Sequence, residues 1–361
     1  MMQLLEKGKL GSITLQNKVV MAPMTRSRAG SDHVPTPIMA TYYAQRSGAG
    51  LIITEGTAPS PDGAGYARIP GIWSQEQVEA WKPVTQAAHK GGAAIFMQLM
   101  HTGRVGHPDN LPAGAKLIAP SAIAPATTQM WSDQAGATLP IPAPEAIPTE
   151  ALPQVVQSFV KAAQNAIAAG FDGVELHAAN GYLLEQFLSP HANQREDAYG
   201  GSAENRNRFV LEVARAVSEA IGKEKTGIRI SPYGAFNDIF AFEGIDEQYQ
   251  LLVEGLNQLA LAYLHMVNHA SMGAPEVPEA IQAMCRHTFK GTYILSGGFD
   301  QTSAEGALSA NRGDLVAFGR PFLSNPDLVE RFRKGQPLAQ PDFNTLYTPG
   351  EVGYTDYPNA E

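Results

Sequence analysis

Three polar side chains stand close together in the segment VELHAANGYLLEQFLSPHANQREDAYGG, residues 174–201. His177 ends a short apolar run typical of a buried strand, and Asn180 follows three residues later, on the predicted first turn after it. Both could donate N–H groups to one carbonyl oxygen, an oxyanion-type site worth about 10²–10³ in rate per donor. Tyr182 adds an O–H that could protonate a neighbouring carbon. The alternative is an ordinary histidine beside a loop asparagine and tyrosine, but three donors at one strand end favour function.

Short apolar runs that end in polar residues or glycine recur along the chain and predict strands buried on both faces. They cover residues 17–22, 50–54, 93–99, 172–177, 227–231, 263–268, 292–296 and 314–319. Between them, amphipathic patterns predict helices at 74–90, 150–169, 203–221, 246–259, 278–286, 302–309 and 326–334. This alternation predicts one (β/α)8 TIM barrel over residues 1–361. The rival, an open doubly wound sheet, would normally use fewer parallel strands before a second domain begins.

One segment interrupts this rhythm. Residues 107–150 contain eight prolines and no helical period, which is too long for a routine connection. Barrel sites lie at the C-terminal ends of the strands, so an insertion after the third strand should border the pocket. We therefore predict a lid-like excursion here, with simple decoration of the surface as the alternative.

Composition excludes several classes of protein. The net charge of −9 and the scattered basic residues argue against nucleic acid or an anionic membrane as the main partner. The charged start of the chain (residues 1–10) does not resemble a signal peptide, and no apolar run approaches the ~18 residues of a membrane span. The single cysteine, Cys285, excludes an internal disulfide and a cysteine-held cluster, and it is predicted to be a buried small residue. A cytoplasmic enzyme is the expectation.

Glycines follow the last two predicted strands, where barrels commonly hold a phosphate between backbone N–H groups and a helix N-terminus. They are Gly297 and Gly298 in SGG, and Gly319, followed by Arg320, in FGR. Two tight strand-ending turns are the alternative. No G-x-G-x-x-G follows a strand, so a separate dinucleotide-binding domain is not expected.

Several motifs in order resemble the Old Yellow Enzyme family of FMN-dependent ene-reductases. The resemblance covers nearly the whole chain, through LGSITLQNKVVMAPMTRSRA (10–29), QLMHTGR (98–104), HAANGYLLEQFLSP (177–190), AFGRPFLSNPDL (317–328) and GYTDYP (353–358). It implies FMN at the barrel mouth, reduced by NADPH or NADH, and an α,β-unsaturated carbonyl or other electron-poor alkene as the substrate. Both half-reactions would use one site.

The resemblance also implies roles for individual residues. Flavin contacts are expected from the main chain of Pro23 and Met24, from the Thr25 hydroxyl, from Gly56 and Gln98 at the pyrimidine edge, and from Arg229 beside that edge. A cation there would stabilise the charge of the reduced flavin. Phosphate contacts are expected from Gly297, Gly298, Gly319 and Arg320.

On the substrate side, the resemblance makes His177 and Asn180 the pair that holds the carbonyl oxygen, and Tyr182 the proton donor. Tyr66 and Tyr347 match aromatic residues that line the pocket, although either could be a packed loop tyrosine. Met100 stands where many relatives carry a tryptophan. A flexible thioether in place of a rigid ring should alter stereochemistry and substrate size rather than turnover.

Two other functions remain open alternatives. A cofactor-free lyase or aldolase would need a Schiff-base lysine or a carboxylate–metal cluster, and Lys116 and Lys290 are poorly placed for the former. His265 and His269 are four apart at a strand end, where such residues are far apart, so no metal site is predicted. A non-catalytic flavin carrier is the second alternative. The sequence leaves open NADPH or NADH, the physiological substrate, and a monomer or homodimer.

Overall fold

Eight parallel strands form a closed barrel in a computed structural model of the chain, which describes residues 2–360. In spatial order they are β3 (Val19–Met21), β4 (Leu51–Ile53), β5 (Ala94–Leu99), β10 (Gly173–Ala178), β11 (Thr226–Ile230), β12 (Tyr263–Val267), β13 (Thr292–Ser296) and β14 (Leu315–Phe318). β14 pairs in parallel with β3 and closes the barrel. The predicted (β/α)8 fold is confirmed, and each predicted strand overlaps an observed one.

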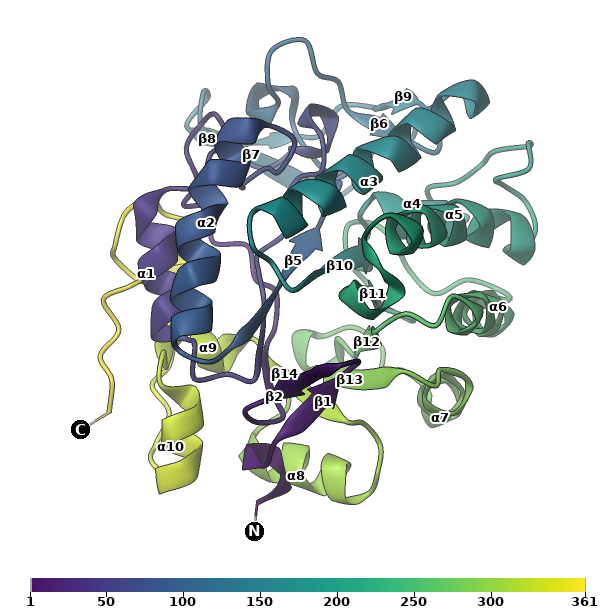
Figure 1. Cartoon of the computed structure of the whole chain (residues 1–361). Coiled ribbons are helices and arrows are strands. Elements are labelled where there is room, and N and C mark those ends of the chain that lie inside the picture. Colours follow the sequence, from purple (N-terminus) through teal and green to yellow (C-terminus); the bar gives the residue numbers. More distant parts are fainter. Residues whose placement is uncertain (1, 361) are drawn as a thin grey trace.

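Helices surround the strands on the outside of the barrel (Figure 1). They are α1 (Pro37–Gln45), α2 (Gln75–Lys90), α3 (Leu152–Ala168), α5 (Ala203–Ile221), α6 (Ile245–Gln258), α7 (Glu279–Thr288) and α8 (Gln301–Ser309), followed by α9 (Arg320–Ser324) and α10 (Leu328–Lys334). Ser74 and Gln77 form a capping box that begins α2. The sequence does not predict α1, because the apolar residues of this helix do not recur on one face.

The bottom of the barrel is closed by an N-terminal hairpin that the sequence analysis did not name. Strands β1 (Gly8–Leu10) and β2 (Ile13–Leu15) pair antiparallel. Leu10 and Leu15 are buried in one cluster with the residues that fill the barrel, such as Phe96, Tyr263 and Ile294. This end is therefore packed with side chains, and the C-terminal ends of the strands carry the open face.

The predicted excursion, residues 107–150, contains two small paired elements. β7 (Gln129–Ser132) and β8 (Ala137–Pro140) form a hairpin, and β6 (Ile118–Ala119) pairs with β9 (Glu145–Ala146). Arg195 holds the segment down by donating to the carbonyls of Pro120 and Ile147, at 3.1 and 2.5 Å. Buried apolar residues of the excursion pack against Tyr66 and Tyr182. The excursion thus stands behind two predicted site residues, and its movement as a lid stays a prediction.

The C-terminal segment returns to the start of the chain. Tyr354 stacks on Tyr42 of α1, with ring centroids 4.1 Å apart and planes 9° apart. Arg26 donates to the carbonyl of Gly353 at 2.6 Å, and Arg46 donates to that of Tyr354 at 3.4 Å. Among residues 2–360, no helix is long and apolar enough to span a membrane.

Candidate active site

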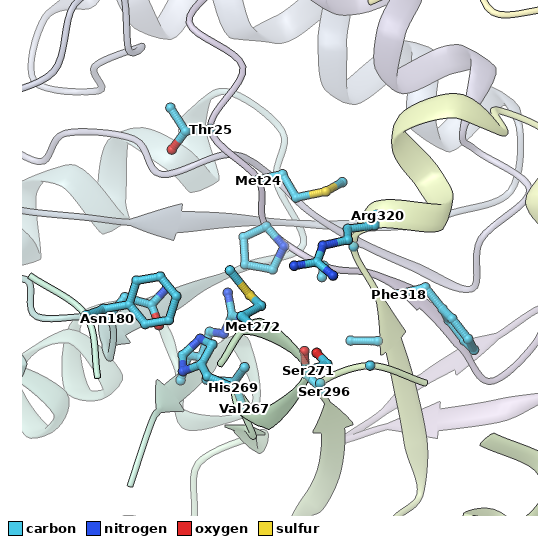
Figure 2. A pocket seen from close by; sticks show the side chains of 18 of the residues that line it. Met24, Thr25, Asn180, Val267, His269, Ser271, Met272, Ser296, Phe318 and Arg320 are labelled. Carbon is cyan, nitrogen blue, oxygen red and sulfur yellow. The ribbon is translucent and has the colours of Figure 1, made fainter. Parts of the chain in front are cut away.

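A cavity of about 680 Å³ opens at the C-terminal ends of the barrel strands. Every predicted site residue except Gly56 and Tyr66 lines it, from Pro23, Met24 and Thr25 after β3 to Gly319 and Arg320 after β14. Figure 2 shows Asn180 at one end and Arg320 at the other, with His269 and Met272 between them. Residues far apart in sequence therefore share one site, and its two ends differ in chemistry.

At the first end, His177, Asn180 and Tyr182 come together at the end of β10 and on the turn that follows it. His177 still belongs to β10, and Asn180 adopts a left-handed conformation with φ of 60°. The chain thereby turns sharply before α4 (Leu183–Leu188), for which Tyr182 is the N-cap. A strand end followed by an αL asparagine thus places three donor-bearing side chains around one cavity.

The protonation states suit neutral hydrogen-bond donors. Burial, reinforced by the positive charge of Arg229, lowers the pKa of His177 well below its ordinary value, so its imidazole is neutral at pH 7. Nδ1 of His177 and Oδ1 of Asn180 are buried without a hydrogen-bond partner among the described residues. Since buried polar atoms are normally paired, these atoms indicate a site built for a ligand.

Tyr182 is paired with a second tyrosine. Its hydroxyl lies 3.0 Å from that of Tyr66, and its ring packs edge-on against His177 with centroids 4.9 Å apart. Burial raises the pKa of Tyr182 to about 12, and burial also raises that of Tyr66 well above its ordinary value. Both hydroxyls are protonated at neutral pH. Tyr66 does not line the cavity and stands behind Tyr182, against the excursion.

The floor of the cavity contains a buried charge network that the sequence analysis missed. Glu175 in β10 accepts a hydrogen bond from Nε2 of Gln98 at 2.8 Å, and its other oxygen lies 2.8 Å from Nδ1 of His265. Burial disfavours its charge, but His265, Arg229 and Gln98 together hold the pKa of Glu175 below its ordinary value. Its carboxylate therefore balances Arg229, whose side chain lines the cavity and is 6% exposed.

At the second end of the cavity, Gly297 and Gly319 differ in whether the surrounding protein leaves room for a side chain. Gly297 has φ of 127°, and a Cβ there would lie 1.9 Å from the carbonyl oxygen of Asn268, so the backbone itself requires glycine. Gly319 has a negative φ of −96°, and the nearest neighbour of a Cβ there would be Met24 Sδ at 3.5 Å. No protein atom crowds this position, and the open space suits a ligand. Helix α9 has only five residues, which is too short to contribute a helix dipole at this end. The positive charge here therefore comes from the side chain of the exposed Arg320.

Gly56 and Tyr66 are the predicted residues that lie outside the lining. A Cβ at Gly56 would lie 2.3 Å from Sδ of Met100, so this glycine makes room for that methionine. Several lining residues carry no sequence signal, including Phe236, whose ring lies 4.5 Å from that of His269. Others are Met272, Phe299, Phe343 and Leu346, which lie in the short turns and connections that follow β12, β13 and α10.

The fold and this cavity define a (β/α)8-barrel enzyme that holds a donor-rich end and a basic, glycine-rich end in one pocket. Comparison with known proteins makes this class specific. Residues 4–339 match the model of the NADH:flavin oxidoreductase / NADH oxidase family, and the chain belongs to this family. The resemblance to the Old Yellow Enzyme family is confirmed.

Individual relatives cover almost the whole chain. The chain is 42% identical to 12-oxophytodienoate reductase 1 of Oryza sativa subsp. japonica, over 99% of this chain and 93% of that protein. It is 42% identical to a probable flavin mononucleotide-dependent alkene reductase of Leishmania infantum, over 97% of this chain and 95% of that protein.

Solved structures agree with these relatives. Morphinone reductase superposes with a TM-score of 0.95 at 43% identity, covering 99% of this chain and 96% of that one. An old yellow enzyme homologue from Zymomonas mobilis also gives a TM-score of 0.95, at 39% identity, covering 99% of this chain and 100% of the other.

Proposed function

We propose that this chain is an FMN-dependent reductase that uses NADPH or NADH to reduce the C=C bond of α,β-unsaturated carbonyl compounds and other electron-poor alkenes. The observation that carries the proposal is the joining of His177, Asn180 and Tyr182 in one cavity with Arg229 and Arg320. The family and the names of the relatives agree with it. No lysine lines the cavity among the described residues, which removes support for a Schiff-base lyase or aldolase.

The residues present fit FMN. The volume of about 680 Å³ lies within the range of small-molecule sites. Nε of Arg229 is buried at the cavity without a hydrogen-bond partner among the described residues. Its N–H is therefore free to donate to a polar atom of a bound ligand. Gln98 and Thr25 add polar groups nearby, and the open face of Gly319 beside Arg320 suits a phosphate. Contacts from Pro23, Met24, Gly297 and Gly298 belong to the same proposal.

The chemistry that bound FMN supplies is hydride transfer, from the nicotinamide to the β-carbon of the alkene. The chain's own residues prepare the alkene for it. His177 and Asn180 donate hydrogen bonds to the carbonyl oxygen and draw electron density away from the β-carbon. Tyr182 delivers the proton that the α-carbon needs, and hydride plus proton together balance the reduction. The hydroxyl of Tyr66 lies 3.0 Å from that of Tyr182, so after the transfer it can donate to the Tyr182 oxygen and stabilise the negative charge left there.

The remaining assignments concern selectivity and setting. Tyr347 is 58% exposed at the rim of the cavity, which suits contact with the outer part of a substrate. Met100 lines the inner wall, where its flexible side chain would shape the choice of alkene face. A cytoplasmic location and a monomer or homodimer stay predictions.

The visible spectrum of the purified protein, titrated with a simple phenol, tests both cofactor and site. We expect a flavin spectrum that gains a broad long-wavelength band as the phenolate stacks on the isoalloxazine, held by His177 and Asn180. The double variant His177→Ala/Asn180→Ala should keep the flavin and lose the band. His287→Ala, at an exposed position on α7, is the matched control and should keep both. A protein that cannot be loaded with FMN would contradict the proposal, and an unchanged band in the double variant would contradict the donor pair.

A further inference from the structure

A second buried carboxylate, Glu185 of α4, lies behind the turn that carries Asn180. It is 3% exposed. One oxygen accepts from the backbone N–H of Gly181 at 2.5 Å. The other accepts from the hydroxyls of Ser231 at 2.6 Å and Tyr249 at 3.0 Å. Three donors thus converge on one acidic side chain that neither lines the cavity nor belongs to the chemistry described above.

Ser231 connects this carboxylate to the substrate pair. Its hydroxyl donates to Glu185 and accepts from the backbone N–H of Asn180 at 2.9 Å. Glu185 therefore holds two successive N–H groups, that of Gly181 directly and that of Asn180 through Ser231. On the other side, Nδ2 of Asn237 donates to the carbonyl oxygen of Asn180 at 2.7 Å.

These bonds offset an unfavourable backbone. Asn180 and Gly181 have φ of 60° and 78°, and the left-handed region costs about 1–2 kcal/mol for a residue with a side chain. The turn persists because its amides have fixed acceptors. We propose that the Glu185 carboxylate is a positioning residue that acts through Ser231 and Gly181 to orient Asn180 toward the substrate's carbonyl oxygen. This inference rests on the proposed function in one respect: the proposed function supplies the carbonyl oxygen as the group that Asn180 binds.

The charge state of Glu185 gives the inference a pH dependence. Burial raises the pKa of Glu185 to about 7, although the donors around it oppose the rise. Above pH 7 the carboxylate accepts all three hydrogen bonds. Below pH 7 one oxygen carries a proton and can no longer accept from the group that faces it. Substrate binding should therefore weaken as the pH falls through 7.

Neighbouring groups on the packed elements do not share this titration. Tyr249 of α6 has its pKa raised by burial well above the ordinary value, and Arg206 of α5 stays positively charged. On β10, His177 has its pKa lowered by burial and Glu175 has its pKa held below the ordinary value. Burial lowers the pKa of His269 to about 3.

Other ionisable groups lie on the loops beside α4. His101, Arg104 and Asp62 precede it, with Nε2 of His101 3.5 Å from Asp62, and His191 follows it. None of them bonds to Glu185 or Ser231 among the described hydrogen bonds. A titration that belonged to these loops would persist when Glu185 is replaced, so the variant distinguishes the two origins.

The test measures the Kd of 2-cyclohexen-1-one for the oxidised, FMN-loaded enzyme from pH 6 to pH 8.5, by perturbation of the flavin absorbance. This ketone does not titrate, and without NAD(P)H it is not reduced. Wild-type affinity should fall about fivefold from pH 8 to pH 6, a typical coupling between linked sites. Glu185→Gln should bind weakly at every pH. Tyr249→Phe, which removes a donor but leaves the path to Asn180, should keep the pH dependence with its midpoint moved upward.

Hydrogen exchange of the backbone across residues 178–184 supplies a readout that needs no substrate. Glu185→Gln and Ser231→Ala should both exchange faster than the wild type there, while the hairpin β7–β8 stays unchanged. Unaltered exchange in both variants, or a Glu185→Gln protein with wild-type Kd values and pH profile, would overturn the inference. Faster exchange in a protein that shows no response to the enone would support the role of Glu185 in the turn and refute the proposed function separately.

Discussion

Two acidic side chains ten residues apart, Glu175 and Glu185, are buried beside the same cavity in opposite settings. Glu175 lies in the strand floor with Gln98 and His265 as partners and Arg229 as a counter-charge, and its pKa is held down. Glu185 lies in the turn region with neutral donors only, and its pKa rises to about 7. A buried acid that balances a charge fixes electrostatics, whereas one that only accepts hydrogen bonds can act as a pH-sensitive brace.

The largest effect is expected in the turn region, where Tyr182 begins the helix that carries Glu185. Tyr182→Phe should slow enone reduction by about 10²–10⁴ if the hydroxyl is the general acid, because the α-carbon then lacks its proton donor. Reduction of the flavin by NADPH should be unaffected, since this step needs no proton from Tyr182. Stopped-flow spectroscopy measures the two half-reactions separately. Equal rates of enone reduction in variant and parent would place the proton donor elsewhere.

The next effect compares the stabilities of Glu175→Gln and Glu185→Gln by urea unfolding at pH 5 and pH 8. Glu175→Gln should lose about 3–5 kcal/mol, because Arg229 is left buried without its counter-charge. This loss should be nearly equal at both pH values. A lowered folded-state pKa stabilises the protein above the ordinary carboxyl pKa, and that contribution disappears only when the pH falls below this range.

Glu185→Gln should behave in the opposite way. Because its folded-state pKa of about 7 exceeds the unfolded one, the folded wild type binds the extra proton between these values and loses stability as the pH rises. The wild type should therefore lose about 2–3 kcal/mol relative to Glu185→Gln from pH 5 to pH 8. Glu55, whose pKa burial also raises to about 7, is present in both proteins and cancels in the difference. Parallel stability curves for wild type and Glu185→Gln would contradict this contrast.

The smallest effect is expected where neither network reaches, at Met100. Its side chain packs in an apolar cluster with Ala58, Ala64 and Ile69 beside the tyrosine pair. Met100→Trp should change the ratio of product enantiomers by about 1 kcal/mol, since a larger rigid ring rejects one orientation of a bulky alkene. Chiral chromatography of the products measures it, with a small, unhindered enone as the control. Identical products across bulky substrates would show that Met100 does not select the alkene face.

Sequence patterns predicted the barrel well, because buried parallel strands are continuous apolar runs with polar or glycine ends. They also predicted His177, Asn180 and Tyr182, since motif and strand end coincide there. The partners of Glu185 were not predictable in this way, because Ser231 and Tyr249 are 46 and 64 residues away and only the closed barrel brings them together. One signal was present for both acids. Each is a lone charge in an apolar run, VELHA or LLEQFL, where burial needs a partner.

The returning C-terminal segment has a consequence for synthesis on the ribosome. The buried guanidinium groups of Arg26 and Arg46 find acceptors on Gly353, Leu346, Leu323 and Tyr354, all made more than 270 residues later. The barrel seam likewise joins β3 and β14, which are the first and last barrel strands in the sequence. On a nascent chain these two guanidinium groups lack their folded acceptors, and the edge of β3 stays unpaired, until residues 315–354 have been made. Residues 323–354 therefore act as a latch that closes over the start of the barrel.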